Sequence, residues 1–134
     1  MSHTTDSAIP TRIASINDTV VGHKLRVAGK ILCYDPLSAR ALLLDKDIAL
    51  LVDVSLCLDR WSSSWIRERL APVMIIGHLE AVDTRLPLPE LPDHALPPLV
   101  NQDIYLQALL VIATPTLDLT LWNQSIQEGE ETLT

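Results

Sequence analysis

Residues 24–35 read KLRVAGKILCYD, a run in which apolar and polar side chains alternate. In an extended chain Leu25, Val27 and Ile31 fall on one side, and the cationic side chains fall on the other. This pattern predicts a strand with one buried face. Gly29 lies on the buried side, where the missing side chain permits a sharp bend or a bulge. The fold must therefore accommodate a long first strand that can coil strongly.

Four more segments follow with recognisable patterns. RALLLDKDIALLVDV at 40–54 places two apolar runs around a short polar DKD, which indicates a hairpin. A change of period predicts a short helix near 62–70, stopped by Pro72, whose Trp65 and Ile66 we expect to plug the bottom of a barrel. VMIIGHLEAVDT at 73–84, with an internal Gly77, and QDIYLQALLVIAT at 102–114 predict the last two strands.

The order of these elements predicts an all-β chain. Five strands, a short helix between strands 3 and 4 and a C-terminal helix are the order of an OB-fold, a small Greek-key barrel. A generic five-stranded α+β sandwich is the alternative. We expect one domain over 1–134, with a flexible tail at 1–10 and a proline-rich loop at 84–100, because five of the nine prolines lie within 86–98. We expect this loop to join neither a sheet nor a helix.

Charge and composition exclude several function classes. The formal net charge is −7, which disfavours strong autonomous binding to nucleic acid unless basic groups cluster. The four histidines have no ligand spacing relative to Cys33 and Cys57, so we expect no metal, no cofactor and two free thiols. No catalytic constellation is visible, so we expect no enzyme. The N-terminus lacks a signal-peptide layout and no apolar run could span a membrane, which predicts an intracellular chain.

The C-terminal segment LDLTLWNQSIQE predicts a helix over 116–128, with Thr116 as its N-cap. At roughly 100° per residue its apolar side chains form two stripes rather than one. A helix on its own barrel buries one stripe, so the other predicts a partner surface. The alternative is that the domain buries both stripes, or that the helix is shorter and Leu117 belongs to the exit of the last strand. Either stripe could face the partner. The first stripe is Leu119, Trp122 and Ile126, and the second is Leu117, Leu121 and the small Ser125.

Three motifs resemble a known family. LRVAGKILCYDPLSARALLL at 25–44 is similar to the first hairpin of the smallest subunit of the CST telomere complex, with its Leu-Arg pair, glycine, Tyr-Asp and later arginine. VMIIGHLE at 73–80 looks like the fourth strand of that family, and LDLTLWNQSIQE at 117–128 looks like its C-terminal helix. The small subunit of replication protein A shares the same layout and is the alternative.

The resemblance implies a non-catalytic subunit that forms a heterodimer with a larger OB-fold subunit through the C-terminal helix. It further implies a third CST subunit, single-stranded telomeric DNA bound mainly through the complex, telomere capping, restraint of telomerase and fill-in by polymerase alpha–primase. The location would be the nucleus, at the telomere. A small β-barrel ligand carrier or enzyme is a rival from another class, and a module that binds through the proline loop is a third.

One basic cluster lies on a regular element. OB-folds bind single strands with a basic groove and aromatic platforms. We therefore predict weak, auxiliary DNA contacts, although the same cations could simply be a solvated face and Arg26 could form a salt bridge. The candidates are Lys24, Arg26, Lys30 and Arg40, with Tyr34 and Tyr105 as the only aromatic candidates.

Overall fold

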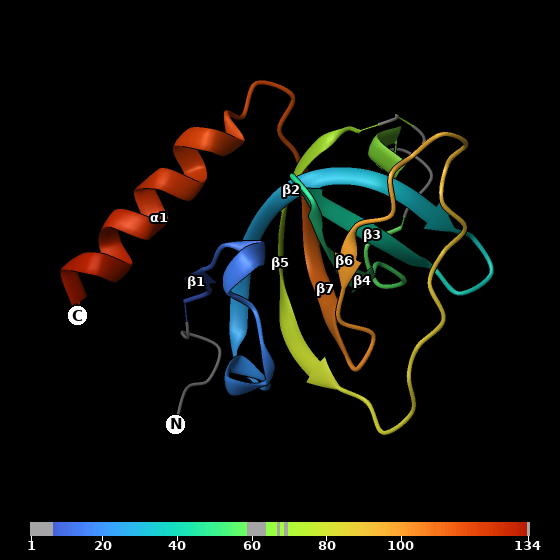
Figure 1. The fold of residues 1–134 in the computed structure, drawn as a ribbon, viewed down its shortest axis with the longest axis horizontal. Coiled ribbons are helices and arrows are strands. Elements are labelled where there is room, and N and C mark those ends of the chain that lie inside the picture. The colour runs from blue at the N-terminus through green and yellow to red at the C-terminus, as the bar shows by residue number, and fades with distance from the viewer. Residues whose placement is uncertain (1–6, 59–63, 67, 69, 134) are drawn as a thin grey trace.

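The computed structural model describes residues 7–58, 64–66, 68 and 70–133 (Figure 1). Within these, strands and short 3-10 turns precede a single C-terminal α-helix. The elements in chain order are β1 (Ile9–Pro10), η2 (Ile13–Ser15), η3 (Asp18–Val20), β2 (Lys24–Asp35), β3 (Arg40–Asp45), β4 (Ile48–Asp53), η4 (Ser64–Ile66), β5 (Pro72–Ala81), β6 (Leu99–Val100), β7 (Ile104–Ala113) and α1 (Leu119–Leu133).

Five strands close into a ring in the order β2-β3-β4-β7-β5, with β5 returning to β2. The closure depends on β2, whose residues 24–30 pair with β5 and whose residues 30–35 pair with β3. Figure 1 shows β2 curving across the barrel. Gly29 lies at the change of partner, where a Cβ atom would stand 2.7 Å from the Leu43 side chain. The structure therefore confirms the predicted OB-fold barrel, and Gly29 lies where β2 bends from one partner strand to the other.

The barrel interior is mainly aliphatic. Side chains that point inward from all five strands are buried, and Leu25, Leu43, Ile75 and Leu106 are among the least exposed. Ile13 from η2 joins this core, as does Trp65 from η4, with Ile66 packed against it. The sequence interpretation of Trp65 and Ile66 as core-filling residues agrees with this packing.

Four boundaries differ from the sequence predictions. The predicted tail over 1–10 lies outside the described residues at 1–6, and its end differs from the prediction, because Ile9 and Pro10 form β1 and pair in parallel with β2. The predicted helix at 62–70 lies partly outside the described residues, and its described part is one 3-10 turn over 64–66. The end of the proline-rich loop is not excluded from the sheet, since Leu99 and Val100 form β6 beside β4. The C-terminal helix runs over Leu119–Leu133 instead of 116–128.

The position of α1 matters most for function. Figure 1 shows the helix outside the barrel, alongside β1 and β2, with the proline-rich loop on the opposite side. Helix α1 and the proline-rich loop therefore lie against different outer faces of one barrel. Of the helices that the structure describes, none has the length and apolar character needed to cross a membrane.

Candidate partner interface

Helix α1 begins one turn later than the sequence predicted, because Asp118 and not Thr116 caps it. The Asp118 carboxylate accepts hydrogen bonds from the backbone N–H groups of Thr120 at 3.0 Å and Leu121 at 3.2 Å. The preceding residues form a separate turn, in which the Leu117 N–H donates to the Thr114 carbonyl at 2.9 Å. An acidic cap also suits the positive end of the helix dipole. The prediction that Thr116 is the cap was therefore wrong.

One stripe of α1 faces the barrel. Leu119, Trp122 and Ile126 are half-buried, and α1 contacts β2. The guanidinium carbon of Arg26 lies 5.8 Å from the centroid of the Trp122 ring, a cation–π geometry. The Asn123 side-chain amide donates to the Asp45 carboxylate at 2.9 Å. Two polar contacts and three half-buried side chains therefore fix the helix against β2 and the end of β3.

The second stripe faces away from the barrel. Leu121 is 59% exposed and Ser125 is exposed, while Leu117 in the preceding turn is half-buried. These three residues line a groove of about 660 Å³ between the end of β7 and the start of α1. None of the α1 side chains that the structure describes is fully buried. Leu121 and Ser125 therefore lie on the outward side of the helix, and the assignment of this stripe to a partner stays a prediction.

Apolar side chains are also exposed on the sheet, on β7 and, in part, on its neighbour β5. On β7, Leu110 is 48% exposed and Ile112 is 41% exposed, and they pair across to Ile76 and Met74 on β5. Ala113, which follows Ile112, lines the groove itself. We call this surface the open face, defined as Met74, Ile76, Leu110, Ile112, Leu117, Leu121 and Ser125. Water is a poor solvent for such a surface, so its burial against a partner would be favourable.

The sequence analysis missed the strand half of the open face. The available signal was the run ALLVIA at 108–113, in which alternation disappears. An apolar residue at every position indicates that both faces of a strand are covered, one by the core and the other by something else. Ala108 points inward and is buried, and a bulge at Leu109, where the pairing with β5 shifts, turns Leu110 and Ile112 outward, with exposures of 48% and 41%.

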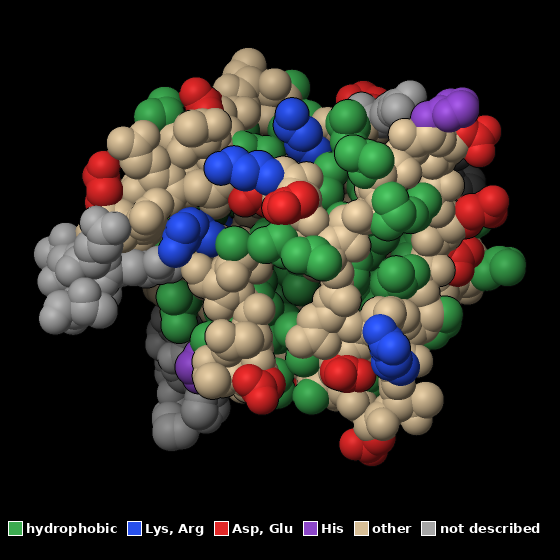
Figure 2. Space-filling model, viewed as in Figure 1, with side chains coloured by type: hydrophobic (Ala, Val, Ile, Leu, Met, Phe, Trp, Pro, Cys, Tyr) green, Lys and Arg blue, Asp and Glu red, His purple; other side chains and the backbone are tan. Residues whose placement is uncertain are grey.

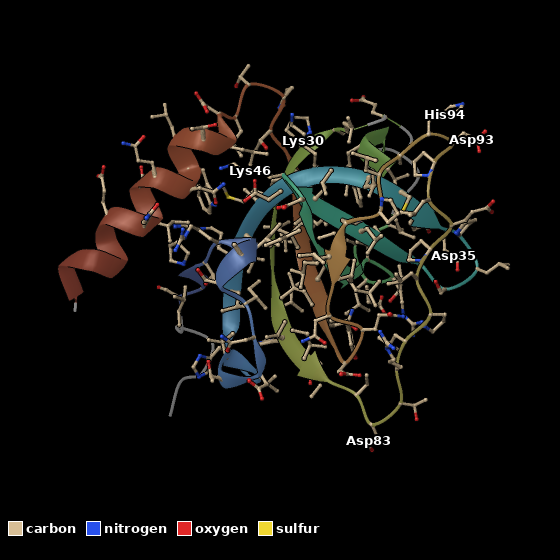
Figure 3. All side chains as sticks on the ribbon, viewed as in Figure 1. Lys30, Asp35, Lys46, Asp83, Asp93 and His94 are labelled. Atoms are coloured by element: carbon tan, nitrogen blue, oxygen red, sulfur yellow. The ribbon has the colours of Figure 1, made fainter. Side chains whose placement is uncertain are left out.

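The six predicted DNA contacts do not form one site. Lys24, Arg26 and Lys30 follow the outer face of β2 as predicted, with Lys30 exposed and Arg26 under the ring of Trp122. Figure 3 shows Lys30 and the exposed Lys46 near each other, on the side that carries α1. Figure 2 shows that acidic side chains are interspersed with the cations on this side of the molecule. The basic row is therefore short and partly covered by the helix.

The other three candidates lie elsewhere. Arg40 lies opposite Asp35 in the register of β2 and β3. The Asp35 carboxylate holds the turn of this hairpin by accepting a hydrogen bond from the Leu37 N–H at 3.0 Å. The Ser38 hydroxyl donates to that carboxylate at 2.8 Å and, with the Leu37 N–H, holds its pKa below the ordinary value. Tyr34 is half-buried against the main core, and burial raises its pKa. Tyr105 packs on the opposite outer face, against buried residues of β3 and β4.

The described part of the chain contains no cluster of side chains that could bind a metal ion. No three His, Cys, Asp or Glu side chains gather there in an arrangement that could hold an ion. Cys33 and Cys57 are free, and partial burial raises the pKa of both thiols. The described residues instead leave apolar side chains exposed on a helix and on a sheet.

Comparison with solved structures supports the fold. A chain of the S. pombe Stn1–Ten1 complex matches with a TM-score of 0.66 and 22% identity, over 95% of each chain. The telomere capping protein Ten1 from Saccharomyces pombe matches at 0.64 and 22% identity, over 93% of this chain and 99% of that chain. The asparaginyl-tRNA synthetase of Entamoeba histolytica matches at 0.59 and 15%, over 87% of this chain and 26% of the synthetase.

These identities show a shared fold. The match to Ten1 agrees with the family resemblance seen in the sequence and confirms the OB-fold. The match to a synthetase shows that the same barrel serves an unrelated protein, so the barrel alone does not assign a function. No family model matches the sequence, and no curated protein matches it.

Proposed function

We propose that this chain is the small OB-fold subunit of a CST-like telomere complex, joined to a larger OB-fold subunit through the open face. The observation that carries the proposal is the second stripe of α1, where Leu121 is 59% exposed, together with Leu110 and Ile112 on β7, which are 48% and 41% exposed. The similarity over nearly the full length of S. pombe Ten1, including a chain seen with Stn1, supports a partner of this class.

The remaining functions of the complex follow from this assignment. With a net charge of −7, the chain is poorly suited to hold DNA alone, so single-stranded telomeric DNA would be bound mainly through the larger partner and a third subunit. The complex would cap the telomere in the nucleus, restrain telomerase and bring polymerase alpha–primase for fill-in. Localisation restricted to chromosome ends would separate this role from that of a replication protein A subunit, which would act at replication sites throughout the genome.

Replacement of two helix residues tests the partner assignment. Leu121→Ala combined with Trp122→Ala should abolish co-purification with the larger OB-fold subunit, because it truncates an exposed anchor, which typically costs about 2 kcal/mol or more, and removes the ring that holds α1 against β2. Leu37→Ala combined with Leu96→Ala is the matched control, since both leucines are almost fully exposed and lie away from the open face. A stoichiometric complex that survives the helix replacements would contradict the proposal.

The auxiliary DNA role has its own test. Lys24→Glu with Lys30→Glu should weaken binding of a single-stranded telomeric oligonucleotide by the assembled complex modestly, because only a few phosphate contacts are lost. The isolated chain should show negligible binding before and after the change. An unchanged affinity of the complex in a titration at fixed salt would remove DNA contact from this surface.

A further inference from the structure

The proline-rich loop between β5 and β7 packs on the barrel. On the outer face of β3 and β4, Leu42, Ala49 and Leu51 are buried, with exposures of 0%, 4% and 0%. The side chains that cover them include Leu86 and Leu91 from the loop. We call this surface the covered face, defined as Leu42, Ala49 and Leu51. Figure 1 shows the loop running along this side of the molecule.

The loop presents selected side chains inward. Leu86 and Leu91 are half-buried and Pro89 is buried, whereas Leu88 and Glu90 between them are exposed. Figure 3 shows Asp83, Asp93 and His94 directed away from the barrel. Proline restricts the backbone before folding, so an extended segment of this composition loses less entropy when it is fixed on a surface. The segment therefore has a defined inner side and an acidic outer side.

Backbone hydrogen bonds hold both ends of the loop. At its start, Leu86 and Gln102 form a closed pair: the Leu86 N–H donates to the Gln102 carbonyl at 3.0 Å, and the Gln102 side chain donates to the Leu86 carbonyl at 2.8 Å. At its end, the Leu99 N–H donates to the Asp47 carbonyl at 2.8 Å, and β6 pairs with β4. These bonds fix the loop across the strands it covers.

The position of the loop has a chemical consequence. In OB-folds the outer face of the second and third strands, with the first and last loops, binds oligonucleotides. Here those strands are β3 and β4, and the loop before the last strand is the proline-rich one. We infer that this loop is a built-in occupant of the covered face and closes it to single-stranded nucleic acid. Any strand held by the proposed complex would then contact this chain elsewhere.

The chemistry of the covered face supports closure. Single-strand sites combine a basic groove with aromatic platforms on which bases stack. Leu42, Ala49 and Leu51 supply neither, and the nearby Tyr105 is already packed against them. Glu90 and Asp93 on the exposed side of the loop would repel phosphates. The inference rests on the proposed function for its relevance to DNA, but the loop contacts involve only this chain and can be tested without a partner.

Thiol reactivity can report whether the loop is seated. Cys33 packs against the covered face, and it shares a cavity of about 340 Å³ with Pro92 and Asp93 of the loop. In a Cys57→Ser background, Leu86→Asp with Leu91→Asp should raise the rate at which Cys33 reacts with a thiol reagent by about tenfold, because a local opening becomes more populated. The matched control is Leu88→Asp with Leu96→Asp, which adds the same charge on exposed side chains and should leave the rate unchanged. Equal rates in both variants would overturn the inference.

Nuclear magnetic resonance of the unmodified chain can detect even weak contact of nucleic acid with the covered face. With an oligothymidylate of about 15 nucleotides, the amide signals of Leu42, Ala49 and Leu51 should not move. Movement of these signals together with those of loop residues 86–91 would overturn the inference. This result would leave the partner assignment intact, because α1 and β7 are not involved.

Hydrogen exchange keeps the inference testable if the Asp variants do not fold. In the unmodified chain, the amides of Leu86 and Leu99 should exchange as slowly as those of β4, because both donate within the seated loop. Exchange of both amides within the first time point would show that the loop is not fixed and would overturn the inference.

Discussion

The barrel has two apolar outer faces, and they differ in what covers them. On the covered face, Leu42 and Leu51 have no exposure, because the chain supplies its own proline-rich loop. On the open face, Leu110 and Leu121 remain about half exposed, because α1 leans on β2 and leaves β7 uncovered. The covered face therefore contributes to the stability of this chain, whereas the open face is the one that the proposed function assigns to a partner.

Leucine truncation on the two faces should give the largest difference. Leu42→Ala is expected to lower the free energy of unfolding by about 2–5 kcal/mol, because it leaves a cavity among fully buried side chains. Leu110→Ala should lower it by about 1 kcal/mol or less, because that side chain is already half in water. Urea unfolding of both variants measures the two values. Equal losses would erase the distinction between the faces.

Binding to the partner should show the opposite order, with the larger loss from substitutions on the open face. Leu110→Ala with Ile112→Ala is expected to weaken the complex with the larger OB-fold subunit by about tenfold or more, because both side chains would be buried only in the complex. Ala95→Gly in the loop, on the covered side, should leave the affinity unchanged. Calorimetric titration gives both constants. Full affinity in the β7 variant would remove this strand from the interface.

The capping of α1 should have a smaller and more local effect. Asp118→Ala is expected to destabilise the helix by about 1 kcal/mol, because two N–H groups of the first turn lose their acceptor. Amide exchange should accelerate in α1 and stay constant in β3 and β4. Thr116→Ala is the control, and a larger effect there would restore Thr116 as the cap.

The smallest expected effect concerns the contact between α1 and β2. Arg26→Gln should loosen the helix by about 0.5–1 kcal/mol, since it removes the cation from the face of Trp122. A change in Trp122 fluorescence cannot be read directly while Trp61 and Trp65 emit, so amide exchange in α1 is the measurement. Unchanged exchange would mean that Asn123 and the apolar stripe hold the helix without Arg26.

The regular elements of the barrel were predictable from local patterns. The alternation in residues 24–35 gives β2, and the apolar runs around residues 45–47 give β3 and β4. The two stripes of α1 were also visible in sequence, because helical periodicity depends only on spacing. The outward direction of Leu121 was not, since it depends on how the helix docks on β2.

The two outer faces were harder to predict. The strands RALLLD and IALLVD are apolar on both sides, which signals two covered faces, but no local pattern shows that residues 86–91 provide the cover. The prolines predicted an irregular loop and could not indicate its long-range contacts. The helix start was misplaced because Thr116 and Asp118 both carry oxygen acceptors, and the turn at Thr114–Leu117 decides between them.

Hydrogen exchange of the complex, compared with the isolated chain, tests the assignment of the two faces most directly. When the larger OB-fold subunit binds, the amides of residues 108–113 in β7 and of residues 119–129 in α1 should exchange more slowly. The amides of β3, β4 and the loop at 86–100 should be unchanged. Protection of β3, β4 and the loop, with no change in β7 and α1, would contradict the account.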